Sequence, residues 1–172
     1  MLRRLAGIVW EFATSLFIAG LAAFTINVFV AEGALIEQGP SMQPNLYVGY
    51  RVMTEKVTYH FREPQRGDVV VINRPAGETA LIKRVIGLPG ETVSVIDGHA
   101  YINGEPIAEP WVSYFGGRDC PPTYIPPGYF FAIGDNRRDS LDSRALGPFA
   151  EHDIRGHAFI VYWPPDEIKL LR

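Results

Sequence analysis

The longest apolar stretch of the chain lies close to its N-terminus. Residues Phe12 to Ala31 include no ionisable side chain, and Glu11 and Glu32 flank them. About 20 residues are what an α-helix needs to cross a hydrocarbon core of about 30 Å. The apolar part of a cleaved signal peptide is shorter, about 7–15 residues, and a cut after Ala31 would require a small residue where Phe29 stands. The pattern therefore predicts a retained membrane anchor.

The charges around this stretch predict its orientation. Arg3 and Arg4 precede it, whereas Glu32 and Glu37 follow it and the next basic residue is Arg51. Since positive charge is retained on the cytoplasmic side, the N-terminus should be cytoplasmic and the chain after the anchor extracytoplasmic. We therefore expect three parts, which are a cytoplasmic tail at residues 1–11, a transmembrane anchor at 12–31 and an extracytoplasmic domain at 32–172.

Short strand-like segments separated by turn residues make up most of the chain after the anchor. The clearest hairpin signal is Asp97-Gly98, which separates two runs rich in β-forming residues. Many short strands bounded by Gly, Pro and Asn indicate a mainly β fold, an antiparallel β-barrel or sheet. The Pro- and Gly-rich part at 98–127 is expected to form a small accessory excursion. The expected strands cover residues 51–57, 68–72, 80–86, 92–96, 99–102, 128–133 and 158–162.

Composition narrows the functions that are open to the chain. Hydrophobic residues make up 47% and charged residues 20% of its 172 residues. Acidic and basic residues are interleaved at a net charge of −3, so no basic stripe is available for nucleic acid. Cys120 is the only cysteine, which excludes an intrachain disulfide and favours a packing role. The sequence contains neither a His-Glu-x-x-His motif nor paired cysteines, so we expect no metal and no cofactor.

Ser41 is the first residue that stands out chemically. It lies between two prolines in Gly39-Pro40-Ser41-Met42-Gln43-Pro44. Proline fixes φ at about −65° and restricts the residue before it, so the two prolines stiffen the backbone on both sides of one hydroxyl. A Pro-rich turn with an incidental serine would be the simpler interpretation unless another residue activates the hydroxyl.

Lys83 is the candidate base for Ser41. It lies in the apolar run 80–86, where one face of a strand can be buried. Full burial disfavours the ammonium and can lower a lysine pKa by about 3–5 units. The alternative is that Lys83 and Arg84 form a charged pair on an edge strand, which protects against aggregation. A Ser-His-Asp triad also stays open because triad residues can be far apart in the chain, and its candidate histidines are His60, His99, His152 and His157.

A polar loop follows the strand that is expected to end at Ile133. From Gly134 to Arg144 the sequence alternates acids, arginines and serines and contains no lysine or glutamate. This segment is too polar for a core and too specific in composition for a linker. It is therefore a candidate for supporting the chemistry of Ser41 and Lys83.

Taken in order, these segments resemble the type I signal peptidases of bacteria, which are membrane-anchored serine/lysine endopeptidases. The resemblance covers nearly the whole chain. Each segment alone is a weak signal, whereas the ordered set is highly specific. After the anchor it consists of Ser41-Met42-Gln43-Pro44, Arg66-Gly67-Asp68-Val69-Val70, Lys83-Arg84-Val85-Ile86-Gly87, Gly134-Asp135-Asn136-Arg137 and Ser140-Leu141-Asp142-Ser143-Arg144.

The resemblance implies a role for several residues of these segments. Ser41 would be the nucleophile and Lys83 the general base, with Ser140 hydrogen-bonded to Lys83 and orienting it. The supporting ion pairs would join Asp142 to two arginines and so hold the loop against the lysine strand. These two arginines are Arg144 and Arg84.

One departure from the family pattern concerns the oxyanion that forms on the attacked carbonyl. The Ser41 backbone N–H would be one of its donors. Some family members place a serine two residues before the nucleophile as a second donor, whereas this chain has Gly39 at that position. The second donor would then be the Gly39 amide, a water or a neighbouring group.

The resemblance also implies the substrate and the partners. Signal peptides of exported preproteins would be cleaved after small residues in an Ala-x-Ala pattern, through an acyl-enzyme. Shallow apolar pockets can accept alanine and exclude larger side chains. The protein would act as a monomer beside the protein-export translocon, in the lipid bilayer of the plasma membrane or of a thylakoid membrane. The residues expected to bind substrate are Leu35, Ile36, Gly39, Met42, Leu46, Leu81 and Ile82.

Two other classes of function stay open. The first is a catalytically inert, membrane-tethered β module that binds exported proteins, which the joint presence of Ser41 and Lys83 disfavours. The second is a specialised Ser/Lys processing peptidase, such as a conjugative-transfer enzyme or a self-cleaving repressor-like protein. The anchor disfavours the repressor, and the loop Gly134–Arg144 favours the general signal peptidase.

Overall fold

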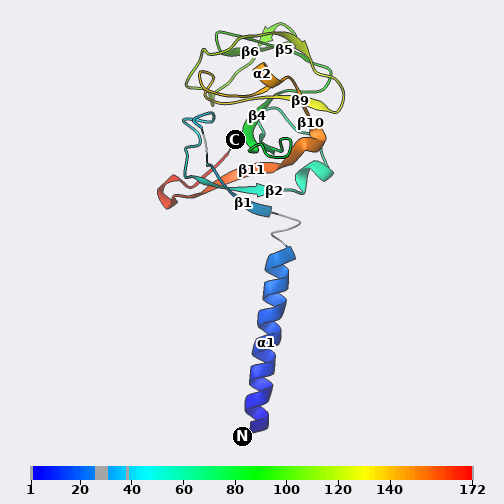
Figure 1. Ribbon diagram of the computed structural model, residues 1–172, viewed down its shortest axis with the longest axis vertical. Helices are drawn as coiled ribbons and strands as arrows, with labels where there is room; N and C mark the ends of the chain where they lie inside the picture. The colour runs from blue at the N-terminus through cyan, green and yellow to red at the C-terminus, as the bar shows by residue number, and fades with distance from the viewer. Residues whose placement is uncertain (1, 26–30, 38, 172) are drawn as a thin grey trace.

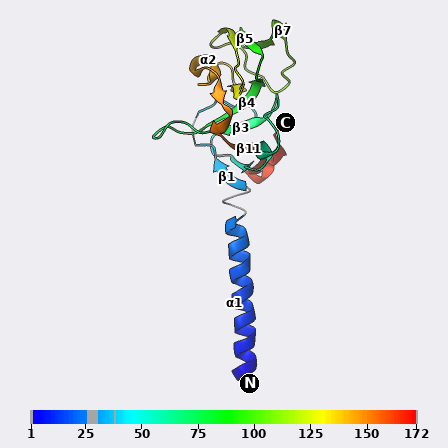
Figure 2. The same cartoon turned by 90° about the vertical axis from the view of Figure 1, so that its right-hand side faces the viewer.

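The computed structural model describes residues 2–25, 31–37 and 39–171. Helix α1 (Leu2–Thr25) stands clear of a β domain in two perpendicular views (Figure 1 and Figure 2). The anchor predicted at 12–31 overlaps α1, although its residues 26–30 lie outside the described part. Its last residue was assigned wrongly, because Ala31 pairs with Glu55 in a strand. Within the described ranges, no helix combines the length and the hydropathy that a membrane crossing requires.

A large antiparallel sheet forms most of the β domain. Its strand order is β1-β2-β11-β3-β4-β9-β10, and β12 pairs with β11. All of these pairings are antiparallel, which confirms the predicted mainly β, antiparallel fold. The strands are β1 (Ala31–Leu35), β2 (Arg51–Glu55), β3 (Val69–Ile72), β4 (Leu81–Gly87), β9 (Tyr129–Ile133), β10 (Phe149–Ala150), β11 (Ile154–Trp163) and β12 (Lys169–Leu170).

A smaller sheet lies at the end of the domain that is remote from α1 (Figure 1). Its order is β7-β6-β5-β8, with β5 (Thr92–Ile96), β6 (His99–Ile102), β7 (Glu105–Pro106) and β8 (Cys120–Tyr124). The predicted excursion at 98–127 covers most of this sheet, but the sheet also includes β5, which pairs with β6 and β8. Short helices complete the chain, namely η2 (Thr58–His60), α2 (Ser143–Leu146), η3 (Glu151–Asp153) and η4 (Pro165–Glu167).

The expected strands leave out β1, β8 and the three two-residue strands β7, β10 and β12. Strand β1 was missed because the anchor was extended to Ala31 and the strand sequence Ala-Glu-Gly-Ala-Leu does not alternate clearly. Strand β8 was missed because it includes Pro121 and Pro122. Proline lacks an N–H and is tolerated on edge strands, and β8 lies at one edge of the small sheet.

A buried core joins the two sheets. Ile86, Phe131 and Ile133 of the large sheet pack against side chains of the small one, such as Val93. Cys120 belongs to this core and is 6% exposed, in agreement with its predicted packing role. A single apolar interface therefore fixes the small sheet on strands β4 and β9.

Strand β4 occupies the centre of the large sheet. It lies between β3 and β9, and the opposing pairs include Val70 with Lys83 and Arg84 with Ile133. Lys83 and Arg84 are 2% and 1% exposed, so the interpretation as an edge-strand charge pair is wrong. Since Ile133 is the last residue of β9, the polar loop that begins at Gly134 starts beside Lys83.

Candidate active site

A tight turn that is anchored in the core presents Ser41. The Gln43 N–H donates to the Pro40 carbonyl at 2.9 Å, and the Leu46 N–H donates to the Met42 carbonyl at 2.9 Å. Met42 and Leu46 are buried in the apolar core below the turn. Because the residue next to Ser41 is fixed in this way, the serine has little backbone freedom.

The backbone conformation at position 39 explains why a glycine stands there. Its φ is +77°, in the left-handed region that side chains disfavour, and a Cβ at this position would meet no atom within 4 Å. Some members of the family that the sequence resembles have a serine at this position. Its replacement by glycine in this chain is therefore explained by the backbone conformation and not by a lack of space.

Lys83 lies directly opposite the Ser41 hydroxyl. Its Nζ donates to Ser41 Oγ at 2.9 Å and to the Ile82 carbonyl at 2.9 Å. Burial lowers the pKa of Lys83 from 10.5 to about 8, against the opposing attraction of the Asp142 and Asp135 carboxylates. A lysine with this pKa is far more often neutral near pH 7 than an exposed one, and its free lone pair can take the Ser41 proton.

Gly134 allows two serines to approach the same point. A Cβ at Gly134 would lie 2.3 Å from Ser140 Oγ and 2.4 Å from the Ser41 carbonyl oxygen. The Ser140 hydroxyl is buried, and it has no hydrogen-bond partner among the described residues. The predicted hydrogen bond from Ser140 to Lys83 is therefore not formed in this structure, where Lys83 Nζ donates to Ser41 and Ile82 instead.

Asp142 holds the polar loop in place. Its Oδ1 accepts hydrogen bonds from the Arg144 N–H at 3.1 Å and from Arg144 Nε at 2.9 Å. Its Oδ2 accepts from Arg144 Nη2 at 2.9 Å and from the Gly134 N–H at 3.0 Å. The same carboxylate thus caps helix α2 and fixes the first residue of the loop. The predicted pair of Asp142 and Arg144 is present.

Arg84 has a different partner from the predicted one. It forms a bidentate ion pair with Asp135, with Nε–Oδ1 and Nη2–Oδ2 distances of 2.8 Å each, instead of pairing with Asp142. Neighbouring side chains of a strand point to opposite faces, so Arg84 projects away from Lys83. Its guanidinium lies over the Trp111 ring at 4.8 Å from the centroid, and Asn45 Nδ2 donates to Asp135 at 2.7 Å.

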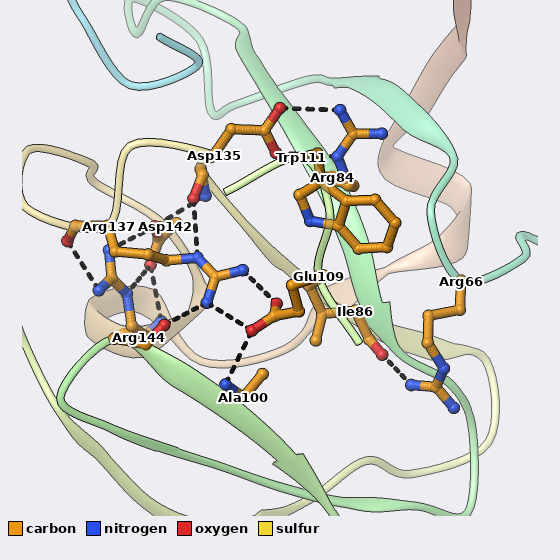
Figure 3. A network of polar contacts seen from close by, with 12 residues as sticks. Arg66, Arg84, Ile86, Ala100, Glu109, Trp111, Asp135, Arg137, Asp142 and Arg144 are labelled. Carbon is orange, nitrogen blue, oxygen red and sulfur yellow. Dashed lines mark hydrogen bonds and ion pairs between the residues drawn. The ribbon is translucent and has the colours of Figure 1, made fainter. Parts of the chain in front are cut away.

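A third buried pair extends this network, which Figure 3 shows. Arg137 pairs with Glu109, and both side chains are almost completely buried. Arg144 Nη1 also donates to the Arg137 carbonyl at 2.9 Å. Buried charges need this kind of complete pairing because the desolvation of an unpaired ion is costly. The three pairs together give the loop a fixed shape beside Ser41.

A groove of about 530 Å³ runs past Ser41 and Lys83. All seven residues predicted to bind substrate line it, from Leu35 and Ile36 on one side to Leu81 and Ile82 on the other. Several further lining residues carry no signal in the sequence, because they become neighbours only when β1, β3, β4, β11 and the loop come together. These are Glu32, Gly33, Ala34, Glu37, Val71, Thr79, Ala80, Asp139, Leu141 and Arg155.

Two supporting residues were also missed, although they stand in the quoted motif. Asp135 binds Arg84, and Asn136 contacts the Ser41 turn through its backbone and side chain. Their neighbours Gly134 and Arg137 belong to the same motif, so the motif itself was the signal. What the sequence could not show was which acid faces which arginine.

Comparisons with known proteins agree on one family. The family model described as signal peptidase, peptidase S26, matches residues 9–163. A signal peptidase I of Leptolyngbya laminosa is 39% identical over 154 residues, which are 85% of this chain and 75% of that protein. Signal peptidase I T of Bacillus subtilis is 39% identical over 172 residues, which are 92% of this chain and 88% of that protein. A crystal structure of a signal peptidase I from Enterococcus faecalis is 32% identical, covers 56% of this chain and 97% of that one, and has a TM-score of 0.46.

The buried state of Lys83 predicts a pH-dependent stability. Its pKa is about 8 when folded and 10.5 ordinarily, so the unfolded chain binds more protons between these values and stability rises with pH. Relative to Lys83→Met, the free energy of unfolding of the unmodified protein should rise by about 3 kcal/mol from pH 7 to pH 10.5. Denaturant unfolding of both proteins across this range measures the difference. A constant difference would show that Lys83 is not desolvated.

Proposed function

The chain belongs to the signal peptidase family, peptidase S26, and we propose that it removes N-terminal signal peptides from exported preproteins with Ser41 as nucleophile and Lys83 as general base. The observation that carries this proposal is the 2.9 Å contact between Lys83 Nζ and Ser41 Oγ, together with the burial of Lys83. A buried lysine that faces a hydroxyl is costly for stability and useful for proton transfer.

The first half of the reaction would form an acyl-enzyme. Neutral Lys83 takes the Ser41 proton while Oγ attacks the scissile carbonyl carbon, and the carbonyl oxygen becomes an oxyanion that the Ser41 N–H stabilises. The Lys83 ammonium then gives its proton to the leaving amine. This amine is the new N-terminus of the mature protein, and the signal peptide stays esterified to Ser41.

The second half would release the signal peptide. Lys83 is neutral again and takes a proton from a water molecule that attacks the ester carbonyl. Collapse of the second oxyanion expels Ser41 Oγ, which takes back the proton from Lys83, and frees the signal peptide as a carboxylic acid that ionises by releasing its proton to solvent. Each proton that Lys83 accepts is thus delivered to the group that leaves.

The groove would select small residues before the cleaved bond. Its apolar lining includes Ile36, Met42 and Leu46, which are buried and packed into the core. Because such a lining cannot easily move, it can accept alanine and exclude a larger side chain by steric clash. This rigidity supports an Ala-x-Ala preference.

The apolar stretch of residues 12–31, of which α1 contains residues 12–25, would attach the peptidase domain to the plasma membrane as a single-pass anchor with a cytoplasmic N-terminus. Large apolar side chains along α1 are exposed, among them Trp10, Phe17 and Phe24. Apolar surface of this kind indicates a contact with lipid or protein. The domain would then work as a monomer close to the membrane surface and beside the export translocon.

The other readings find less support. An inert binding module has no use for a buried lysine that contacts a serine. A specialised Ser/Lys processing peptidase would share the same pair and would differ in its substrates. Cleavage assays with a general preprotein therefore distinguish it from the proposed function.

Removing either member of the pair should abolish cleavage. We expect Ser41→Ala and Lys83→Ala, purified in detergent, to cut a preprotein with an Ala-x-Ala site at least about 1,000 times more slowly than the unmodified protein. Ser113→Ala and Lys169→Ala are matched controls at positions outside the groove and should keep full activity. Full activity of Ser41→Ala or of Lys83→Ala would rule out the role that is assigned to the substituted residue.

The space at Gly134 should be equally critical. Gly134→Ala places a methyl group against Ser140 and the Ser41 carbonyl, so the nucleophile must shift. A displacement of about 1 Å can cost about 100-fold in rate. Gly20→Ala is the control, because a Cβ at that position would meet no atom within 4 Å and its φ lies outside the left-handed region, as at Gly134. Preprotein cleavage by both variants measures the effect, and an active Gly134→Ala enzyme would contradict the close approach.

A further inference from the structure

Asn136 contacts the peptide groups on both sides of Ser41. Its Nδ2 donates to the Pro40 carbonyl at 3.2 Å, and its backbone N–H donates to the Ser41 carbonyl at 3.0 Å. One residue of the loop that follows β9 therefore binds two successive carbonyls of the turn. Neither contact involves the Ser41 hydroxyl or Lys83.

These contacts fix the direction of the Ser41 N–H. The Pro40 carbonyl and the Ser41 N–H belong to one trans peptide group, in which they point in opposite directions. The Pro40 carbonyl also accepts from the Gln43 N–H at 2.9 Å, so two donors hold it. Among the residues that the structure describes, no group accepts a hydrogen bond from the Ser41 N–H. This donor is available to a bound carbonyl.

The neighbours of Asn136 hold it in place. Asp135 is bound by Arg84, and the Arg137 N–H donates to the Tyr114 carbonyl at 2.9 Å. Figure 3 shows Asp135 and Arg137, which flank Asn136 in the chain, in the same buried network. A movement of Asn136 would disturb ion pairs with almost no exposure, so its position is rigid.

The side-chain contact with the Pro40 carbonyl requires an amide, whereas the backbone contact with Ser41 does not depend on the side chain. The Pro40 carbonyl is an acceptor, so the atom that faces it must be a donor. An aspartate at this position would turn a carboxylate oxygen toward the carbonyl oxygen and repel it. The other amide atom, Asn136 Oδ1, is buried and has no hydrogen-bond partner in the described part of the chain.

We propose that Asn136 is a positioning residue that directs the Ser41 N–H toward the oxygen of the carbonyl under attack. It acts through the Pro40 and Ser41 peptide groups and touches no reacting atom. The inference rests on the proposed function of Ser41 as nucleophile. It assigns a role in transition-state stabilisation to a residue outside the Ser41–Lys83 pair.

Two ligands separate this role from ordinary substrate binding. A peptide aldehyde that ends in Ala-x-alaninal would form a hemiacetal, in which the Ser41 Oγ–C bond forms, the C=O π bond opens and the Oγ proton passes to Lys83. Its anionic oxygen then occupies the position that the Ser41 N–H faces. The same peptide as a C-terminal amide would occupy the groove without this bond. Only the aldehyde resembles the transition state.

Asn136→Ala and Asn136→Asp should bind the aldehyde about 10- to 100-fold more weakly and the amide within about twofold of the unmodified protein. For preprotein cleavage, kcat should fall while KM stays constant. Thermal unfolding shows whether Asn136→Ala is folded. If it is not, Asn136→Asp takes its place in the test, because its side chain has the same size as that of asparagine. Equal weakening of both ligands, or no weakening of the aldehyde, would overturn the inference.

Asn45→Ala is the matched control. Asn45 is also an asparagine of this network, and its Nδ2 donates to Asp135 and to the Trp111 carbonyl rather than to the Ser41 turn. It should lose stability and keep the aldehyde-to-amide affinity ratio of the unmodified protein. A similar fall in this ratio would assign the effect to the whole network and contradict a specific role of Asn136. Failure of the unmodified protein to form the hemiacetal would instead refute the Ser41–Lys83 assignment.

Discussion

The burial of Lys83 is the constraint on which the rest of the site depends. Strand β4 lies between β3 and β9, and its residues from Lys83 to Gly87 are buried. Among the described residues no carboxylate lies within salt-bridge distance of Lys83, and its Nζ faces a hydroxyl and a carbonyl instead. An ammonium in these surroundings is poorly stabilised, which lowers its pKa to about 8. The protein accepts this loss of stability at one residue, and the reactivity of Ser41 follows from it.

The other buried cations of the site show the contrast. Arg84, Arg137 and Arg144 each have a carboxylate partner. Their pairs shape the loop without supplying a base, because a paired guanidinium does not give up its proton. The loop in turn brings Gly134 and Asn136 against the Ser41 turn. The site therefore contains paired charges, which hold the loop in shape, and one lysine, which takes part in the reaction.

The sequence was sufficient for some features of this site and insufficient for others. Ser41, Lys83 and seven of the residues that line the groove could be predicted, because the ordered motifs and closeness in sequence carry that information. The other lining residues could not, since only the folded chain makes them neighbours. The partner of Arg84 could not, since Asp135 and Asp142 both lie in one loop and only the pairing of Arg84 with Ile133 decides between them. Strand β8 was hidden by its prolines. The absence of the expected hydrogen bond between Ser140 and Lys83 depends on side-chain positions that no motif encodes.

The titration of Lys83 tests most directly whether this residue is a desolvated base. Nitrogen-detected NMR of the protein with labelled lysine, assigned with a Lys83→Met variant, follows the protonation of Nζ alone. The structure predicts that Lys83 loses its proton near pH 8. Titration of Lys83 near its ordinary pKa of 10.5 would contradict the account.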